Sequence, residues 1–176
     1  MNRWSGLAAV WVTAIALSPV ARSQEPAAGE FRPPPAPEQP VAFSHRVHVG
    51  QGLACTGCHA GAERGDRATL PPTTTCMTCH AAVRTDSAEV QKLAGFHSKK
   101  EDVPWRRVFR LPEYVVFSHT AHVLSGKAVT CETCHGNVRE LTQMQKLKDT
   151  SMAACIACHT EKSAPTRCDS CHEPRG

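Results

Sequence analysis

The sequence predicts a fold of short helices and loops, with little regular secondary structure and almost no core of packed side chains. Aromatic residues make up only 5% of the chain, and long amphipathic periods are few. A chain this poor in large apolar residues cannot bury enough side-chain surface for a conventional core. The motif Cys-x-x-Cys-His, in contrast, occurs five times. We therefore expect whatever these motifs bind to hold the fold together.

All ten cysteines belong to these motifs, which we number in chain order as sites 1 to 5. Cys-x-x-Cys-His is the attachment pattern of c-type haem: the two thiols add to the haem vinyl groups, and the adjacent histidine binds the iron as its proximal ligand. The expected attachment residues are Cys55, Cys58, Cys76, Cys79, Cys131, Cys134, Cys155, Cys158, Cys168 and Cys171. The expected proximal ligands are His59, His80, His135, His159 and His172. The sequence thus predicts five covalently bound haems c.

Two other uses of the cysteines are disfavoured. A disulfide framework does not require a two-residue gap that is always followed by histidine. Structural zinc takes four nitrogen or sulfur ligands. Five cysteine pairs would group unevenly around zinc, and five histidines would be left over.

The N-terminal segment has the pattern of a secretory signal peptide. Arg3 precedes an apolar run over about 7–17, and the small residues Ala21 and Ser23 fit a cleavage site before Gln24. We expect 1–23 to be removed on export, with an uncleaved membrane anchor as the alternative. Export fits haem attachment, which takes place outside the cytoplasm, so we expect a periplasmic protein, with membrane association as a further possibility.

The remaining chain divides into a linker and two modules. Residues 24–40 are rich in proline and predict an extended linker. A two-haem module should follow over 41–110 and a three-haem module over 111–176. Two longer helices are expected, one near 87–94 with Ser87 as N-cap and one near 138–148. The predicted fold class is a multihaem cytochrome c, in which short helices and loops wrap around stacked haems.

Five histidines lie outside the motifs and are candidates for the distal ligands of the irons. They are His45, His48, His97, His119 and His122. Four of them occur in a repeat, "FSHRVH" from Phe43 and "FSHTAH" from Phe117, each just before a haem motif. We expect His45 to serve site 1. We expect His48 to serve site 2 or a site in the other module, with His97 as its competitor at site 2.

From Phe117 onward the chain resembles a cytochrome c7 or c3 unit, which has Phe-x-His-x-x-His followed by three Cys-x-x-Cys-His motifs. The resemblance implies that His119 ligates the iron of site 3 and that His122 reaches the iron of site 5. In that family the middle haem takes a histidine just upstream of its own motif. Here that place holds "TSMAACIACH", so Met152 is the candidate ligand at site 4, with Met144 behind it. The competing interpretation of Met152 is packing against a haem edge.

A wider resemblance covers about 40–160. The stretches "PVAFSHRVHVGQGLACTGCH", "LPPTTTCMTCH", "VPWRRVFRLPEYVVFSHTAH" and "CETCHGNV" resemble the pentahaem cytochrome subunit of alternative complex III, a bacterial membrane quinol oxidoreductase. Members of that family usually carry histidine where this chain has Phe109. The resemblance implies redox partners, namely the other subunits of such a complex and a soluble cytochrome or oxidase.

The predicted function is electron transfer. Five proximal histidines, five spare histidines and Met152 suffice to give every iron two protein ligands, so we expect no haem open to a small-molecule substrate. The alternatives are a free periplasmic shuttle of the c7/c3 type and a haem reductase. The reductase is disfavoured because no acid–base cluster lies beside a motif. The net charge of +4 would be offset by haem propionates, and no nucleic-acid-binding motif is present.

Overall fold

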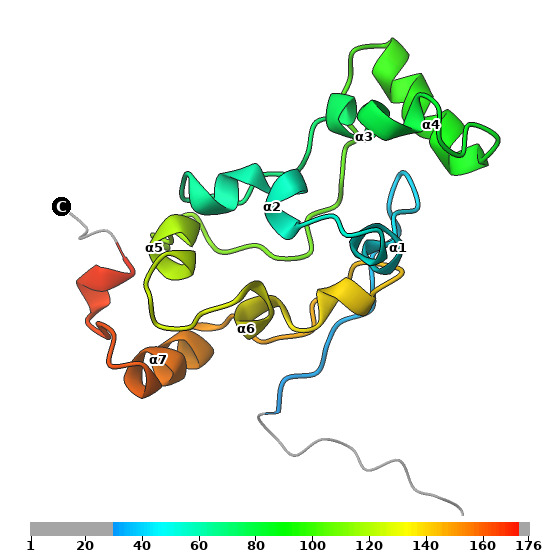
Figure 1. Cartoon of the computed structure of the whole chain (residues 1–176). Coiled ribbons are helices and arrows are strands. Elements are labelled where there is room, and N and C mark those ends of the chain that lie inside the picture. The colour runs from blue at the N-terminus through cyan, green and yellow to red at the C-terminus, as the bar shows by residue number, and fades with distance from the viewer. Residues whose placement is uncertain (1–29, 173–176) are drawn as a thin grey trace, which may run out of the picture. The chain divides into compact units, whose positions relative to one another are not determined.

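The computed structural model describes residues 30–172. The predicted signal peptide and the first residues of the proline-rich segment, 24–29, lie outside the described residues, as do 173–176. From Phe31 onward the chain forms one compact unit. Figure 1 shows that its helices are short and joined by long connections.

The described residues contain helices and turns but no named strand. The α-helices are α1 (His45–Gly50), α2 (Cys55–Cys58), α3 (Thr73–His80), α4 (Ala88–Ser98), α5 (His119–Val123), α6 (Cys131–His135) and α7 (Met152–Glu161). The 3-10 helices are η1 (Ala60–Glu63), η2 (Val138–Glu140) and η3 (Cys168–Ser170). Val115 and His172 form an isolated antiparallel bridge. Within 30–172, no helix combines the length and the apolar character that crossing a bilayer requires.

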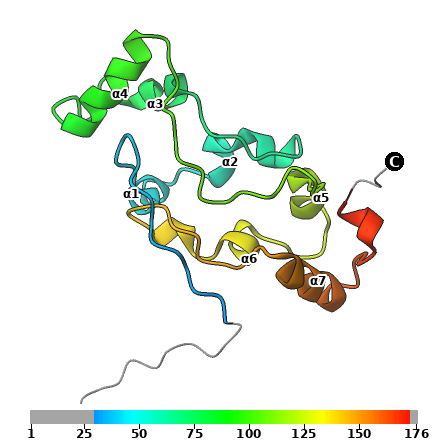
Figure 2. The same cartoon turned by 180° about the vertical axis from the view of Figure 1, so that it is seen from behind.

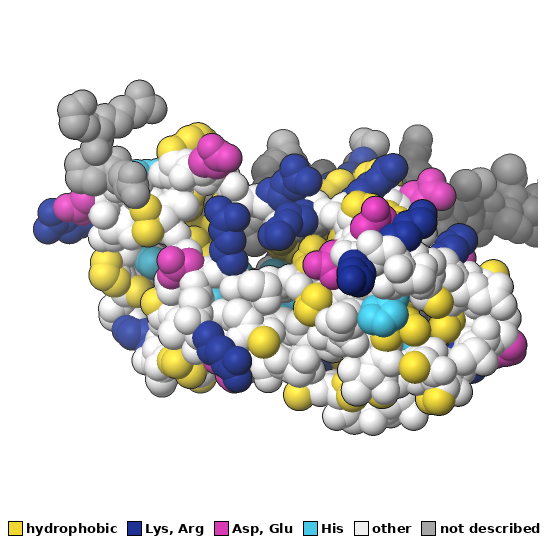
Figure 3. Space-filling view, turned by 90° about the horizontal axis from the view of Figure 1, so that it is seen from above, with side chains coloured by type: hydrophobic (Ala, Val, Ile, Leu, Met, Phe, Trp, Pro, Cys, Tyr) yellow, Lys and Arg dark blue, Asp and Glu magenta, His cyan; other side chains and the backbone are white. Residues whose placement is uncertain are grey.

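The side-chain core of the described unit is very small. Its buried apolar residues are Val41, Leu93 and Val103. The partly buried side chains that pack against them are Cys76, Met77, Phe96 and Trp105. Elsewhere, apolar side chains lie scattered over the surface, as the space-filling view shows (Figure 3). Side-chain packing thus supports the region of α3 and α4 and little else.

The first of the two expected longer helices is present. Helix α4 begins at Ala88, directly after Ser87 at the N-cap position, and Leu93 on its inner face is buried. It extends to Ser98, four residues further than the sequence pattern predicts. The backbone N–H of Ala42 donates to the Glu89 carboxylate at 2.6 Å, which ties α4 to the chain just before α1.

The second expected helix, over 138–148, does not form, and the prediction was wrong. Only η2 is helical, and the backbone turns to an extended conformation at Leu141, with φ −80° and ψ 133°. The Leu141 carbonyl accepts a hydrogen bond from the backbone N–H of Arg46 in α1 at 3.1 Å. The backbone of this segment therefore binds another element instead of closing its own helical turns.

Side chains of the same segment hold the proline-rich stretch in place. The Gln143 side chain donates to the Pro37 carbonyl at 3.2 Å, and the Gln145 side chain donates to the Pro34 carbonyl at 2.7 Å. Proline lacks an N–H but keeps its carbonyl as an acceptor. The proline-rich stretch therefore attaches to this segment through side chains that donate to its carbonyls.

The two halves of the unit are interlocked by the short helices that precede their first motifs. Helix α1 packs on η2, the turn that follows site 3. Helix α5 packs on η1 and the loop after site 1, where the Thr120 hydroxyl donates to the Gly65 carbonyl at 2.8 Å. Figures 1 and 2 show both contacts from opposite sides. Each helix thus docks on the turn that follows the motif of the other half.

Candidate functional site

Each Cys-x-x-Cys-His motif lies on a short helical segment. Site 1 begins with α2, site 2 ends α3, site 3 forms α6, site 4 lies within α7, and site 5 begins with η3. One helical turn places residues i and i+3 on the same side, so the two thiols of a motif face the same way. All ten cysteines lie within the described residues, and each is unpaired and at least partly exposed. The thiols are therefore available for attachment, and no disulfide is formed.

Four of the five motif histidines are oriented by a hydrogen bond from the ring to the backbone. In each case the Nδ1 atom lies 2.5 to 3.1 Å from a carbonyl oxygen. The pairs are His59 with Thr69, His80 with Val83, His159 with Pro165, and His172 with Tyr114. A proton on Nδ1 fixes the tautomer and leaves the lone pair of Nε2 free for a metal.

The repeated Phe-Ser-His-x-x-His segments form α1 and α5. At the start of each helix the serine hydroxyl, Ser44 or Ser118, accepts a hydrogen bond from the backbone N–H three residues on. Such N-caps stabilise a helix that would otherwise be too short to persist. The carbonyl of the same serine lies 2.8 Å from Nδ1 of His48 and, in the second copy, 2.7 Å from Nδ1 of His122. One serine therefore starts the helix and orients its second histidine.

The phenylalanine of each repeat orients both histidines. The Phe43 ring stacks on His48, with ring centroids 4.3 Å apart, and meets His45 edge-on at 4.9 Å. The second copy repeats this arrangement, with the Phe117 ring stacked on one histidine of α5 at 4.5 Å and edge-on to the other at 4.8 Å. The sequence analysis missed these roles of phenylalanine and serine, although the repeat itself was the signal for them.

Four histidines of α1 and α5 each face the ring of a motif histidine. The pairs, with the distance between ring centroids, are His45 with His59 (6.5 Å), His48 with His80 (6.0 Å), His119 with His135 (6.4 Å) and His122 with His159 (6.0 Å). A metal–imidazole bond is about 2 Å long. Two imidazoles on opposite sides of one metal ion therefore have centroids about 6 Å apart. The spacing of all four pairs fits an iron held between two histidines.

One histidine in each of two pairs is shifted toward the neutral form by its surroundings. Burial lowers the pKa of His45, and the neighbouring His59 lowers it further. Burial likewise lowers the pKa of His135, followed by the effect of His119. Only a neutral imidazole has a free lone pair, so both effects favour the ligating form. Nδ1 of His45 is buried without a hydrogen-bond partner, which distinguishes it from His119, whose Nδ1 lies 2.7 Å from the Asp66 carbonyl.

The structure distinguishes between the candidates for site 2. His48 lies opposite His80, whereas His97 is exposed near the end of α4. At site 1 the structure brings together His45 and His59, as the sequence analysis expected.

In the second half, His119 faces His135 of site 3 as expected, but the pairing of His122 differs from the expected one. His122 faces His159 of site 4, not His172 of site 5. Because α5 docks on the loop after site 1, its two histidines reach sites 3 and 4. Met152, the candidate ligand for site 4, is the first residue of α7, and its side chain is 67% exposed. The ring that faces His159 is that of His122.

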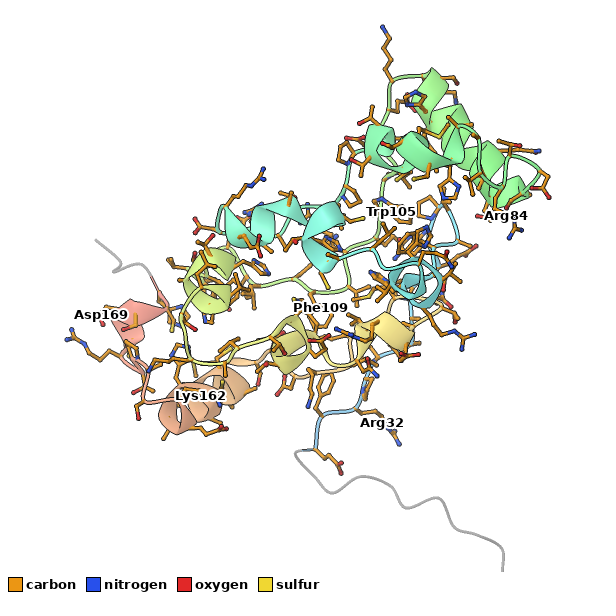
Figure 4. The ribbon with its side chains drawn as sticks, in the orientation of Figure 1. Arg32, Arg84, Trp105, Phe109, Lys162 and Asp169 are labelled. Carbon is orange, nitrogen blue, oxygen red and sulfur yellow. The ribbon has the colours of Figure 1, made fainter. Side chains whose placement is uncertain are left out.

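Phe109 lies at site 3. Its ring meets the His135 ring edge-on, with centroids 4.4 Å apart. Figure 4 shows Phe109 between α2 and α6, the helices of sites 1 and 3. It is therefore a packing residue against a proximal histidine.

Thiols of different motifs lie close enough to influence one another. Burial raises the pKa of four of these thiols, and a cysteine of another motif raises each one further. The pairs are Cys76 with Cys58, Cys131 with Cys55, Cys134 with Cys158, and Cys155 with Cys171. In terms of sites, the neighbours are 2 and 1, 1 and 3, 3 and 4, and 4 and 5.

Comparison with known proteins agrees with this geometry. Residues 20–110 match the class III cytochrome C family, and residues 115–173 match the family described as cytochrome c7 and related cytochrome c. A menaquinone reductase multihaem cytochrome c subunit from Nitratidesulfovibrio vulgaris is 40% identical over 100 residues, which are 56% of this chain and 46% of that protein. The chain thus spans about half the length of this curated relative. The family matches confirm the predicted fold class and indicate covalently bound haem c.

Proposed function

We infer that this chain, which belongs to the class III cytochrome c family, is a periplasmic carrier of five haems that relays electrons as a subunit of a membrane quinone oxidoreductase. Electron transfer by haem c is the activity common to the two matched families. The observation that carries the proposal is the set of four facing histidine pairs beside the motifs.

In this proposal every motif supplies two thioether links and a proximal ligand, and α1 and α5 supply the distal ligands of sites 1 to 4. Bound haem supplies an iron that takes up and releases one electron. The paired histidines would hold four irons from both sides, which would leave no place on those irons for a substrate. The backbone carbonyls that accept from Nδ1 hold the rings in place and increase their basicity. Rigid, saturated ligation of this kind favours electron transfer over catalysis.

The five sites form one row whose order differs from the order along the chain. Helix α1 joins sites 1 and 2, because His45 and His48 face different motifs. Helix α5 joins sites 3 and 4 in the same way. The docking of α5 after site 1 joins the two halves, and the neighbouring thiols extend the row from site 4 to site 5. The order is therefore 2, 1, 3, 4, 5.

The two ends of this row are far apart in the unit. Figure 4 shows Arg84, which follows site 2, and Asp169, which lies in the site 5 motif, at opposite ends. A row of closely spaced sites lets electrons enter at one end and leave at the other. In our proposal one end receives electrons from a partner subunit and the other passes them to a second redox protein.

Membership of a quinone-linked complex is supported by the relative from Nitratidesulfovibrio vulgaris, which is described as a subunit of a menaquinone reductase. It is supported also by the order of motifs, which resembles that of the cytochrome subunit of alternative complex III. A free periplasmic shuttle is the second candidate, favoured by the match of residues 115–173 to the c7 family.

Fractionation of cells that produce the chain naturally distinguishes these candidates. The membrane and periplasmic fractions are run on native and denaturing gels, stained for haem, and the stained bands are identified by peptide mass. We expect a stained band in the membrane fraction, within a large complex whose haem absorbance changes when a menaquinol analogue is added. A stained chain that runs alone in the periplasm would support the shuttle instead. A chain that carries no haem would overturn both.

A further inference from the structure

Site 5 differs from the other four sites in what faces its histidine. Among the described residues, the one aromatic or histidine ring that pairs with His172 belongs to Tyr114, with centroids 5.8 Å apart. Nδ1 of His172 lies 3.1 Å from the Tyr114 carbonyl. The Tyr114 carbonyl therefore lies on the Nδ1 side of the imidazole, away from the Nε2 atom that would bind iron.

No histidine remains for the opposite side of site 5. All ten histidines of the chain lie within the described residues. Eight of them form the four facing pairs, and the ninth is His172 itself. The tenth, His97, lies in α4, which packs on α3 beside site 2. Site 2 is at the opposite end of the row, so His97 is remote from site 5.

The three methionines within the described residues do not fill this place either. Met77 belongs to α3, where it packs against the small core beside site 2. Met144 lies in the extended segment between Gln143 and Gln145, whose side chains bind the proline-rich stretch. Met152 is the nearest in sequence, but its side chain is 67% exposed at the start of α7.

Two residues of the segment beside His172 are exposed to solvent. The segment that pairs with His172 has Tyr114 at 65% exposure and Val116 at 54% exposure. At site 3, in contrast, the proximal His135 is covered by Phe109 at 4.4 Å and faces His119 at 6.4 Å. Site 5 thus combines an oriented proximal histidine with an opposite side that no histidine ring of the described residues faces.

We propose that site 5 holds its haem through His172 alone, and that the sixth position of this iron is a binding site for a small exogenous ligand. The ligands that fit are small σ-donor and π-acceptor molecules, such as carbon monoxide on ferrous iron and cyanide on ferric iron. This inference rests on the proposed five haems. It departs from the expectation that no haem is open to a small molecule.

Carbon monoxide titration of the dithionite-reduced holoprotein tests the proposal. We expect one equivalent of carbon monoxide to bind per chain, seen as a change in the haem absorbance. The ferric protein should give a high-spin electron paramagnetic resonance signal equal to one haem in five, which cyanide converts to low spin. No carbon monoxide binding and a purely low-spin ferric spectrum would overturn the proposal.

Three variants identify the iron concerned. His122→Ala removes the ring opposite His159 and should raise the carbon monoxide stoichiometry from one to two. Met152→Ala and Tyr114→Phe should leave both the stoichiometry and the spin state unchanged. If either of these two variants creates a high-spin iron that the wild-type protein lacks, the altered residue is the sixth ligand and the proposal is wrong.

The haem count, read from the intact mass of the same sample, separates this inference from the proposed function. Five haems without an open iron would contradict the inference and leave the electron carrier intact. Absence of covalent haem would contradict the proposed function itself. Full loading with one carbon monoxide bound per chain supports both.

Discussion

At the scale of single residues, the serine and the phenylalanine of the repeat Phe-Ser-His-x-x-His hold the two histidine rings in position. The serine hydroxyl caps the helix, and the serine carbonyl orients the second histidine. The phenylalanine ring stacks on that histidine and touches the edge of the first. The three-residue spacing lets the two rings of one short helix face two different motifs.

Replacement of His48 tests the assignment of site 2. His48→Ala removes the ring opposite His80, so one haem should change from low spin to high spin, measured by electron paramagnetic resonance of the ferric protein. The matched control is His97→Ala, which alters an exposed side chain on the same side of the unit and should change nothing. A high-spin haem in the control instead would reassign site 2 to His97.

Replacement of Phe109 tests its packing role. Because the ring is only partly buried, Phe109→Ala should cost about 1–3 kcal/mol, less than the ~3–5 kcal/mol of a fully buried ring. The measurement is thermal unfolding of the holoprotein, followed by haem absorbance. Phe109→Leu keeps most of the apolar contact and should retain most of the stability. Equal stability of the alanine variant and the wild type would refute the packing role.

The residues of the candidate sites and three of the four histidine pairings were predictable from the sequence, but the pairing of His122 was not. The five motifs and the repeated histidines are local patterns, because thioether attachment and proximal ligation involve neighbours in sequence. The partner of His122 is decided by tertiary contacts, since α5 docks on the loop after site 1 through Thr120 and His119. A pattern within one segment carries no information on where that segment docks.

At the scale of elements, the interlock between the two halves depends on tight turns after the motifs. A Cβ atom on Gly61 would lie 2.2 Å from the Arg67 carbonyl oxygen, and η1 is part of the surface on which α5 packs. Real Cβ atoms do not approach a backbone oxygen so closely, so the turn needs glycine here.

Gly61→Ala should therefore loosen the interlock. We expect a loss of about 1–3 kcal/mol in the free energy of unfolding, as for other overpacked sites, measured by denaturant unfolding of the holoprotein. Gly50→Ala is the matched control, because a Cβ atom there has nothing within 4 Å. A loss below about 0.5 kcal/mol in Gly61→Ala, within the range of surface substitutions, would contradict the role assigned to this turn.

The sequence predicted a helix correctly where an apolar side chain of that helix is buried in the core. Helix α4 has Leu93 buried against Val41 and Val103, so its apolar periodicity indicates a real packed face. The segment 138–148 has similar periodicity, yet it extends because Leu141 bonds to α1 and its glutamines bond to the proline-rich stretch. Helical propensity is a weak preference that such tertiary contacts override.

At the scale of the whole molecule, the unit has too little buried side-chain surface to be stable by packing alone. The haems should therefore carry much of the stability, and those in the middle of the row should matter most. Sites 1 and 3 lie where the two halves interlock, whereas site 5 lies at an end.

Removal of attachment sites one at a time tests this distribution. The double variant Cys131→Ala with Cys134→Ala, at site 3, should make the whole chain sensitive to protease. The double variant Cys168→Ala with Cys171→Ala, at site 5, should expose only the C-terminal segment. Peptide mapping of limited digests distinguishes the two outcomes. If protease cleaves both variants equally along the whole chain, the haem at site 3 stabilises the fold no more than the haem at site 5.

The most direct test of the central claim is the intact mass of the denatured protein, purified from cells that mature c-type cytochromes. Our account predicts the mass of the polypeptide without residues 1–23 plus five haem groups, with no cysteine free to react with an alkylating reagent. A polypeptide that carries no haem and has ten alkylatable thiols would contradict it.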